Sequence, residues 1–222
     1  MDLTKEVVLE MLYLQNQLEV VISGMDWMAQ AHDYPLAIHM ECAEIIDHTP
    51  WKWWKGGVEQ NDEAIRLELI DIWHFFLAYV LCETEPEGLP DAAEKIAGMW
   101  NAAESLEFSI ADIAVSLGYG MLMDKQFNMY YFCGMCEQVN MSAADLRWLY
   151  VSKNVLNRFR QAYGYADGTY IKDWNGREDN DVLVELVRDA GGLSDGQQGI
   201  TAEELYGLLE SYYETKVLGQ VD

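Results

Sequence analysis

Basic side chains are scarce in this sequence, and the shortage narrows the possible partners. The 222 residues include 14 Lys and Arg against 38 Asp and Glu, which gives a formal net charge of −24. A general nucleic-acid surface needs clustered Lys and Arg to neutralise the phosphate backbone, so we expect no nucleic-acid partner. A small phosphorylated substrate stays compatible with such a chain if metal cations lie between its phosphates and the acidic groups.

Long apolar runs and cysteines are also few. No stretch of 18 or more apolar residues is free of charge, so we expect no membrane-spanning helix. The first residues lack the basic region and apolar core of a signal peptide. Cys42 and Cys82 lie within apolar helical patterns and are predicted to be buried thiols. Cys133 and Cys136 form a single CxxC without a second pair, which disfavours a redox or zinc site. These features together indicate a cytoplasmic protein.

Proline is rare, with four residues, whereas the helix-favouring residues Leu, Met, Ala and Glu are abundant. This composition favours helices, and apolar residues recur at spacings of three and four along most of the chain. We therefore expect an all-α fold, a helical bundle in which residues 1–222 form one domain. The predicted helices are 3–22, 35–48, 61–82, 91–105, 108–123, 126–139, 142–163 and 181–190, with a last one from 201. The predicted loops are 84–90, 165–180 and 191–199, of which 165–180 is a candidate mobile segment.

Residues with known preferences for helix ends mark several of these boundaries. Pro50 forbids an ordinary continuation of the second helix past His48. Asn61, followed by two acidic residues, has the pattern of an N-cap with an acidic first turn. Ser142 with Asp145 three residues later has the spacing of a capping box.

Two pairs of carboxylates stand out because of their spacing and their surroundings. Glu41 and Glu44 lie three residues apart on one predicted helix, and Glu68 and Asp71 lie three apart on a later one. A three-residue step leaves two helical side chains about 60° apart, on one face. Both pairs are embedded in apolar residues, where a bare carboxylate is costly.

The 23 residues between Glu44 and Glu68 leave room for a loop that folds the two helices into an antiparallel hairpin. Four carboxylates would then converge, and they cannot all stay ionised at close range without cations. All-oxygen ligands favour Mg²⁺, with Mn²⁺ as a substitute, over zinc. The alternative is a solvated acidic face, which is common on acidic helices. Two such pairs on apolar helices favour the metal site.

A second group of polar residues lies about a hundred positions further on. Lys153, Asn157 and Arg160 follow at i, i+4 and i+7, so they share one face of a predicted helix. Four of the 14 basic residues fall between 153 and 172. Arg grips phosphate oxygens with a fork of donors, and Lys supplies a point charge. These residues are candidates for phosphate binding; the alternative is a solvated basic face that balances a negative chain.

Both regions resemble one protein family. ECAEIID at 41–47, WKWWK at 51–55 and ELIDIWH at 68–74 are similar to the dimeric dUTPases of kinetoplastids, some bacteria and many phages, within the all-α NTP pyrophosphatase superfamily. KNVLNRFRQAYGY at 153–165 and DGTYIKDWNGREDN at 167–180 resemble the C-terminal motif of the same family. The motifs occur in the family's order, and the resemblance covers roughly residues 10–180.

The resemblance implies a homodimeric enzyme that hydrolyses dUTP to dUMP and pyrophosphate, with dUDP as a further candidate substrate. It implies that Glu41, Glu44, Glu68 and Asp71 hold Mg²⁺. Gln15 corresponds to a family glutamine that reads the base, although this chain has Glu19 where the family commonly has Asn. The residues implied to bind the nucleotide are Gln15, Trp53, His74, Lys153, Asn157, Arg160, Tyr165, Tyr170 and Lys172.

Two other functions share many of these features. An all-α pyrophosphatase acting on another nucleotide, such as dCTP, would keep the same metal ligands. A non-catalytic regulatory relative would keep the fold without turnover, but the intact carboxylates argue against it. In the expected mechanism a metal-activated water attacks the phosphate chain. Glu41 is the preferred group to take the proton of that water, with Glu44 as the second candidate.

Overall fold

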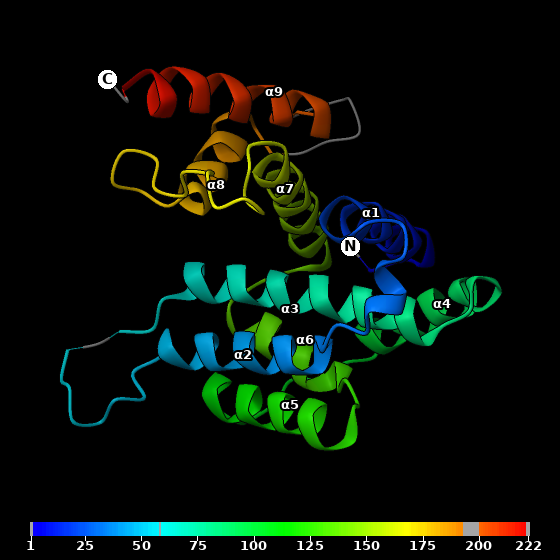
Figure 1. The fold of residues 1–222 in the computed structure, drawn as a ribbon. Helices are drawn as coiled ribbons and strands as arrows, with labels where there is room; N and C mark the ends of the chain where they lie inside the picture. Colours follow the sequence, from blue (N-terminus) through cyan, green and yellow to red (C-terminus); the bar gives the residue numbers. More distant parts are fainter. Residues whose placement is uncertain (1, 58, 193–199, 221–222) are drawn as a thin grey trace. The chain divides into compact units, whose positions relative to one another are not determined.

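The computed structural model describes residues 2–57, 59–192 and 200–220, and these residues form helices without any β-sheet (Figure 1). The expected all-α fold is confirmed for this part of the chain. Its α-helices are α1 (Lys5–Ser23), α2 (Tyr34–Asp47), α3 (Asp62–Glu83), α4 (Leu89–Asn101), α5 (Ile110–Asp124), α6 (Met129–Gln138), α7 (Ala143–Ala162), α8 (Asp179–Asp189) and α9 (Ala202–Tyr212). Among these helices, none is both long and apolar enough to cross a membrane.

The chain divides into two compact units. The first unit comprises Met1–Asn16 and Asp26–Arg147, and the second comprises Gln17–Met25 and Trp148–Asp222. Helices α1 and α7 therefore each contribute to both units. No shift in composition along the sequence marks this division.

The ends of α2 and α3 follow from local side-chain capping. The Asp33 side chain accepts a hydrogen bond from the Leu36 amide at the start of α2. The Asn61 side chain accepts one from the Ala64 amide at 3.2 Å, which confirms the predicted N-cap of α3. The Asn61 amide also donates to the His48 carbonyl at 3.0 Å. The loop between α2 and α3 is thereby closed at its base, and the two helices lie side by side (Figure 1).

The core of the first unit is built around aromatic rings. Trp73 on α3 is fully buried, stacks on Phe132 of α6 at 5.2 Å between ring centroids, and meets Trp100 of α4 edge to face. Helix α2 packs against both α3 and α5. The face of α2 that carries Ile38, Cys42 and Ile45 is buried. This packing fixes the position of the helix that bears Glu41 and Glu44.

Gly118 on α5 allows the close approach of α2. A Cβ at this position would lie 2.8 Å from His39 Nδ1 and 3.3 Å from Cys42 Cβ. Gly118→Ala is therefore expected to destabilise the protein by about 1–3 kcal/mol, because the His39 ring and the neighbouring part of α2 must shift. The free energy of unfolding in urea measures this change. Gly98→Ala on α4 is the matched control: a Cβ added there would meet nothing within 4 Å, so the substitution should stabilise by up to about 1 kcal/mol. Equal effects of the two substitutions would contradict the packing argument.

The second unit has its own aromatic core, formed by residues of α7, α8, α9 and the segment before α8. Phe159 and Trp174 are fully buried and meet edge to face at 5.9 Å. Tyr213, in a π-helical turn that follows α9, stacks on Tyr170 at 5.4 Å. Segment 165–180, predicted to be a loop, is thus anchored in this core through Tyr170 and Trp174.

A few boundaries differ from the expectation. Helix α4 begins at Leu89 instead of 91, because Pro90 is accommodated in the first turn, where no amide donor is needed. It ends at Asn101 instead of 105, where the Asn101 side chain exchanges two hydrogen bonds with the backbone of Leu3. Helix α8 begins at Asp179, two residues early. Of the predicted loop 191–199, residues 193–199 lie outside the described residues.

All four cysteines are free thiols. Cys82 is exposed, so the prediction that it is buried was wrong; it follows Leu81, which occupies the core-facing position at the end of α3. Cys42, Cys133 and Cys136 are buried. Burial raises the pKa of the Cys133 thiol to about 12, which keeps it out of the reactive thiolate form.

Candidate functional site

Three of the four predicted metal ligands come together in the first unit. One carboxylate oxygen from each of Glu41, Glu44 and Glu68 lies within 4.8 Å of the others. Helix α2 supplies the first two and α3 supplies the third, so the cluster depends on the pairing of these helices. Asp71 lies one turn further along α3, half-buried, and is not one of the three.

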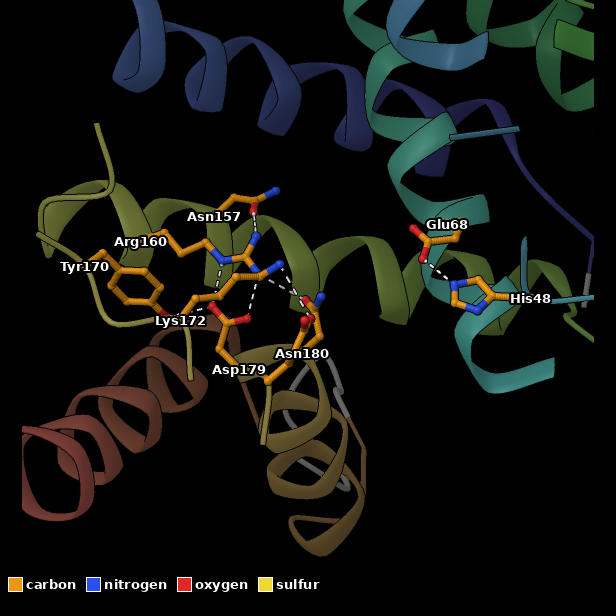
Figure 2. Close-up of polar contacts among 9 residues, drawn as sticks. His48, Glu68, Asn157, Arg160, Tyr170, Lys172, Asp179 and Asn180 are labelled. Atoms are coloured by element: carbon orange, nitrogen blue, oxygen red, sulfur yellow. Dashed lines mark hydrogen bonds and ion pairs between the residues drawn. The ribbon is translucent and has the colours of Figure 1, made fainter. Parts of the chain in front are cut away.

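His48, which was not among the predicted site residues, contacts this cluster. Its Nε2 lies 3.0 Å from Glu68 Oε1 (Figure 2). His48 is the C-cap residue of α2. It follows Glu41 and Glu44 at i+7 and i+4, the spacing that places residues on one helical face. This spacing was the sequence signal that could have identified it.

The chemistry of the cluster fits a hard divalent cation. Three ionised carboxylates so close together repel one another unless protons or cations compensate them. Their oxygens are the ligands that Mg²⁺ and Mn²⁺ prefer, and no cysteine joins them. Glu44 is exposed whereas Glu41 and Glu68 are half-buried, so the cluster is reachable from solvent.

Two residues predicted to read the base lie in contact within the first unit. His74 Nδ1 on α3 is 2.7 Å from Gln15 Oε1 on α1, and both residues are buried. An amide oxygen only accepts hydrogen bonds, so the proton must be on Nδ1 of His74. The contact joins segments 59 residues apart and fixes the orientation of the Gln15 amide.

Trp53 lies apart from this buried pair. It belongs to the loop between α2 and α3, its side chain is 88% exposed, and its ring meets Trp54 edge to face. Asp47, the last residue of α2, accepts hydrogen bonds from Trp51 and Lys52 at the start of the loop. These donors, Lys52 first, lower the pKa of the Asp47 carboxyl.

In the second unit, Arg160 on α7 is held by Asp179, the first residue of α8 (Figure 2). Its Nε and Nη2 atoms donate to the two carboxylate oxygens of Asp179 at 2.8 and 2.7 Å. Arg160 is 8% exposed and Asp179 is fully buried. Asn157 Oδ1 accepts from Nη1 at 3.1 Å, and Asn180 Oδ1 accepts from Nη2 at 3.2 Å.

Tyr170 binds the same carboxylate. Its hydroxyl donates to Asp179 Oδ2 at 2.7 Å. Burial and the neighbouring Asp179 raise the pKa of Tyr170, which keeps its hydroxyl protonated. Burial alone would raise the pKa of Asp179, but the Arg160 and Tyr170 donors outweigh it and leave that pKa below its usual value. Arg160 and Tyr170 thus both bind Asp179, an acid that was not among the predicted site residues, and Asn157 contacts Arg160.

The other residues of this region that were predicted to bind the nucleotide differ in exposure. Lys153 on α7 is buried. Lys172 is exposed, with its Nζ 3.5 Å from a Glu178 carboxylate oxygen. Tyr165 is 47% exposed, and its ring centroid lies 5.8 Å from Arg160 Cζ.

The fold and the cluster define a class: an all-α protein in which two paired helices share a group of carboxylates. The family model described as dUTPase matches residues 8–165, and the chain belongs to this family of dimeric, all-α dUTPases. The protein is therefore a dUTP diphosphatase. A comparison with curated proteins gave no match. The matched region includes the carboxylate cluster, Gln15, His74 and Arg160, and it ends before Tyr170 and Asp179.

Proposed function

We propose that the chain hydrolyses dUTP to dUMP and pyrophosphate in a Mg²⁺-dependent reaction, with Mn²⁺ as a substitute. The observation that carries this proposal is the cluster of Glu41, Glu44 and Glu68 within 4.8 Å. These three residues, with Asp71 beside them on α3, would hold the metal. A bound Mg²⁺ supplies a Lewis acid that polarises the phosphates and acidifies a water.

The residues of the chain contribute binding, orientation and proton transfer. Glu41 is proposed to orient the attacking water and to accept its proton on a carboxylate oxygen, with Glu44 as the alternative base. Lys153, Arg160 and Lys172 are proposed to balance the negative charge of the triphosphate. These three basic side chains then suffice to attract the triphosphate locally, although the net charge of the chain is −24.

Other residues are proposed to bind the nucleoside. Gln15 and His74, already in contact at 2.7 Å, would read the uracil edge, because a fixed amide distinguishes a carbonyl from an amino group. Trp53 is proposed to stack on the base from its exposed loop. Asn157, Tyr165 and Tyr170 complete the proposed nucleotide contacts. The protein is further proposed to be a homodimer in the cytoplasm, and dUDP is a further candidate substrate.

Uracil selectivity is expected to be large. A pocket that pairs with uracil leaves its polar groups unpaired when cytosine presents the inverse pattern, so kcat/KM for dUTP should exceed that for dCTP by at least about a hundredfold. Thymine differs by one methyl, so dTTP should be excluded less strongly. A pyrophosphate-release assay with Mg²⁺ across the eight common nucleotides measures both ratios.

Gln15→Ala should lower the dUTP to dCTP ratio more than it lowers the rate on dUTP. Its matched control is Gln17→Ala, two positions further along α1, where the side chain is exposed. Equal kcat/KM for dUTP and dCTP in the unmodified protein would contradict the proposed selectivity and favour a broader nucleotide pyrophosphatase. Absence of any turnover with Mg²⁺ present would favour the non-catalytic alternative.

A further inference from the structure

We propose that Asp179 is a positioning residue, which fixes the Arg160 guanidinium for contact with the phosphates of the nucleotide and holds the Tyr170 side chain in place beside it. This inference rests on the proposed role of those two residues in binding substrate. Asp179 itself is fully buried, so it acts through its neighbours and does not touch the nucleotide.

The geometry around Arg160 constrains its guanidinium on several sides (Figure 2). Asp179 holds the Nε and Nη2 edge at 2.8 and 2.7 Å. Asn157 meets Nη1, and Asn180 meets Nη2 from the residue next to Asp179. A two-point contact with a carboxylate fixes the plane of the guanidinium as well as its place. The Arg160 guanidinium, which ends a long and flexible side chain, is thereby held in one orientation.

The same carboxylate also orients Tyr170. The Tyr170 hydroxyl donates to Asp179 Oδ2 at 2.7 Å, and the ring stacks on Tyr213. One oxygen of Asp179 therefore accepts from both Arg160 Nε and Tyr170. Two candidate substrate-binding groups, from α7 and from the segment before α8, depend on a single side chain.

A tight turn places Asp179 beside this segment. Asn175 and Gly176 both have positive φ, 61° and 81°, as a two-residue hairpin turn requires. The chain reverses there, and the Asp179 amide donates to the Lys172 carbonyl at 3.1 Å. Lys172, a proposed phosphate ligand, is thus tied through its backbone to the same residue.

Stability alone gives a weak reason for this arrangement. A buried ion pair is often no more stabilising than well-packed apolar side chains of similar size, because both charges lose their hydration. An aromatic core with Phe159 and Trp174 already holds this unit together. Fixing a binding group through a hydrogen-bonded neighbour is a recurrent use of such residues. We attribute the convergence on Asp179 to the orientation of Arg160 for phosphate binding, with the Tyr170 side chain held beside it.

Asp179→Asn in the full chain tests the inference, because it keeps the shape of the side chain and removes its charge. We expect kcat/KM for dUTP with Mg²⁺ to fall roughly ten- to a hundredfold. In an Arg160→Lys background the same change should cost less than about twofold, since Asp179 acts through Arg160. Glu185→Gln, which breaks the exposed Arg177–Glu185 pair in the same unit, is the control and should leave kcat/KM within about twofold.

A purely structural role predicts a different result. Either role lowers the melting temperature of Asp179→Asn, because Arg160 loses its buried counter-ion. A purely structural role, however, would leave kcat/KM measured well below melting within about twofold, or would make the loss in kcat/KM add to that of Arg160→Lys. Either observation overturns the inference. If Asp179→Asn fails to fold, Asp179→Glu keeps the charge and displaces the guanidinium by about one methylene. Its kcat/KM should fall at least about fivefold, and an unchanged value overturns the inference.

The proposed function can fail separately. If the unmodified protein does not hydrolyse dUTP with Mg²⁺, that function is wrong, and calorimetry with inorganic triphosphate and Mg²⁺ then tests Asp179. Binding about tenfold weaker in Asp179→Asn than in the unmodified protein supports the positioning role. Equal binding, or no binding to either protein, overturns it.

Discussion

Replacing Glu44 with glutamine is expected to reduce dUTP hydrolysis by roughly a hundred- to a thousandfold, the scale of a lost metal contribution to the transition state. Glu44 belongs to the group of three carboxylates within 4.8 Å, so glutamine at this position removes a negative charge and one of the two side-chain oxygens. The fold should survive. Because Glu44 is exposed and solvent screens the repulsion, the metal-free protein should gain roughly 0.5–1 kcal/mol in free energy of unfolding at most.

Three measurements check this expectation: pyrophosphate release, Mg²⁺ or Mn²⁺ binding by calorimetry, and unfolding in chelator. Glu83→Gln is the matched control, because Glu83 is an exposed acid at the end of α3, about 22 Å along the helix from Glu68. It should leave activity and metal binding unchanged. Substantial turnover by a Glu44→Ala, Asp71→Ala double variant in excess chelator would refute the metal site.

Replacing Arg160 with methionine is expected to destabilise the second unit by about 3–5 kcal/mol. The guanidinium forms two charge-assisted hydrogen bonds with Asp179, which is fully buried. Without Arg160, that carboxylate must stay buried without its counter-ion or take up a proton. Combining Arg160→Met with Asp179→Leu should recover much of the loss, since no buried charge remains.

Urea unfolding followed by tryptophan fluorescence reports on this unit through the buried Trp174. Arg177→Met is the matched control, because it breaks the exposed Arg177–Glu185 ion pair of the same unit and should cost no more than about 1 kcal/mol. A cost of less than about 1 kcal/mol for Arg160→Met would show that its ion pair behaves like a surface pair. Activity should stay low in the double variant, which separates stability from phosphate binding.

Much of the helical architecture was decided locally in the sequence. The Asn61 cap, the Ser142–Asp145 capping box and the stop before Pro50 act over a few residues, and the structure has a helix boundary at each. The three-residue spacing of Glu41 and Glu44 also depends only on helix geometry. The turn at Asn175 and Gly176 had an equally local signal, an Asn-Gly pair, within a segment that was predicted only as a loop.

The partners of the functional side chains were decided by tertiary structure. Gln15 and His74 meet across 59 residues, and Arg160 and Asp179 across 19. The stripe of Lys153, Asn157 and Arg160 was expected to serve phosphates, but its pattern could not indicate that Arg160 packs against an acid of α8.

The sequence by itself determined the family, the helices and the spacing of the acidic residues on α2 and α3, because helix periodicity, caps and motif spacing are short-range properties of the chain. Only the tertiary structure decided that Glu68 joins Glu41 and Glu44 while Asp71 stays outside the three, and that His48 contacts Glu68. Only it decided that Asp179 holds Arg160. The physical reason is that a buried charge must find an opposite charge or a hydrogen-bond partner, and the packing of distant helices selects which one is within reach.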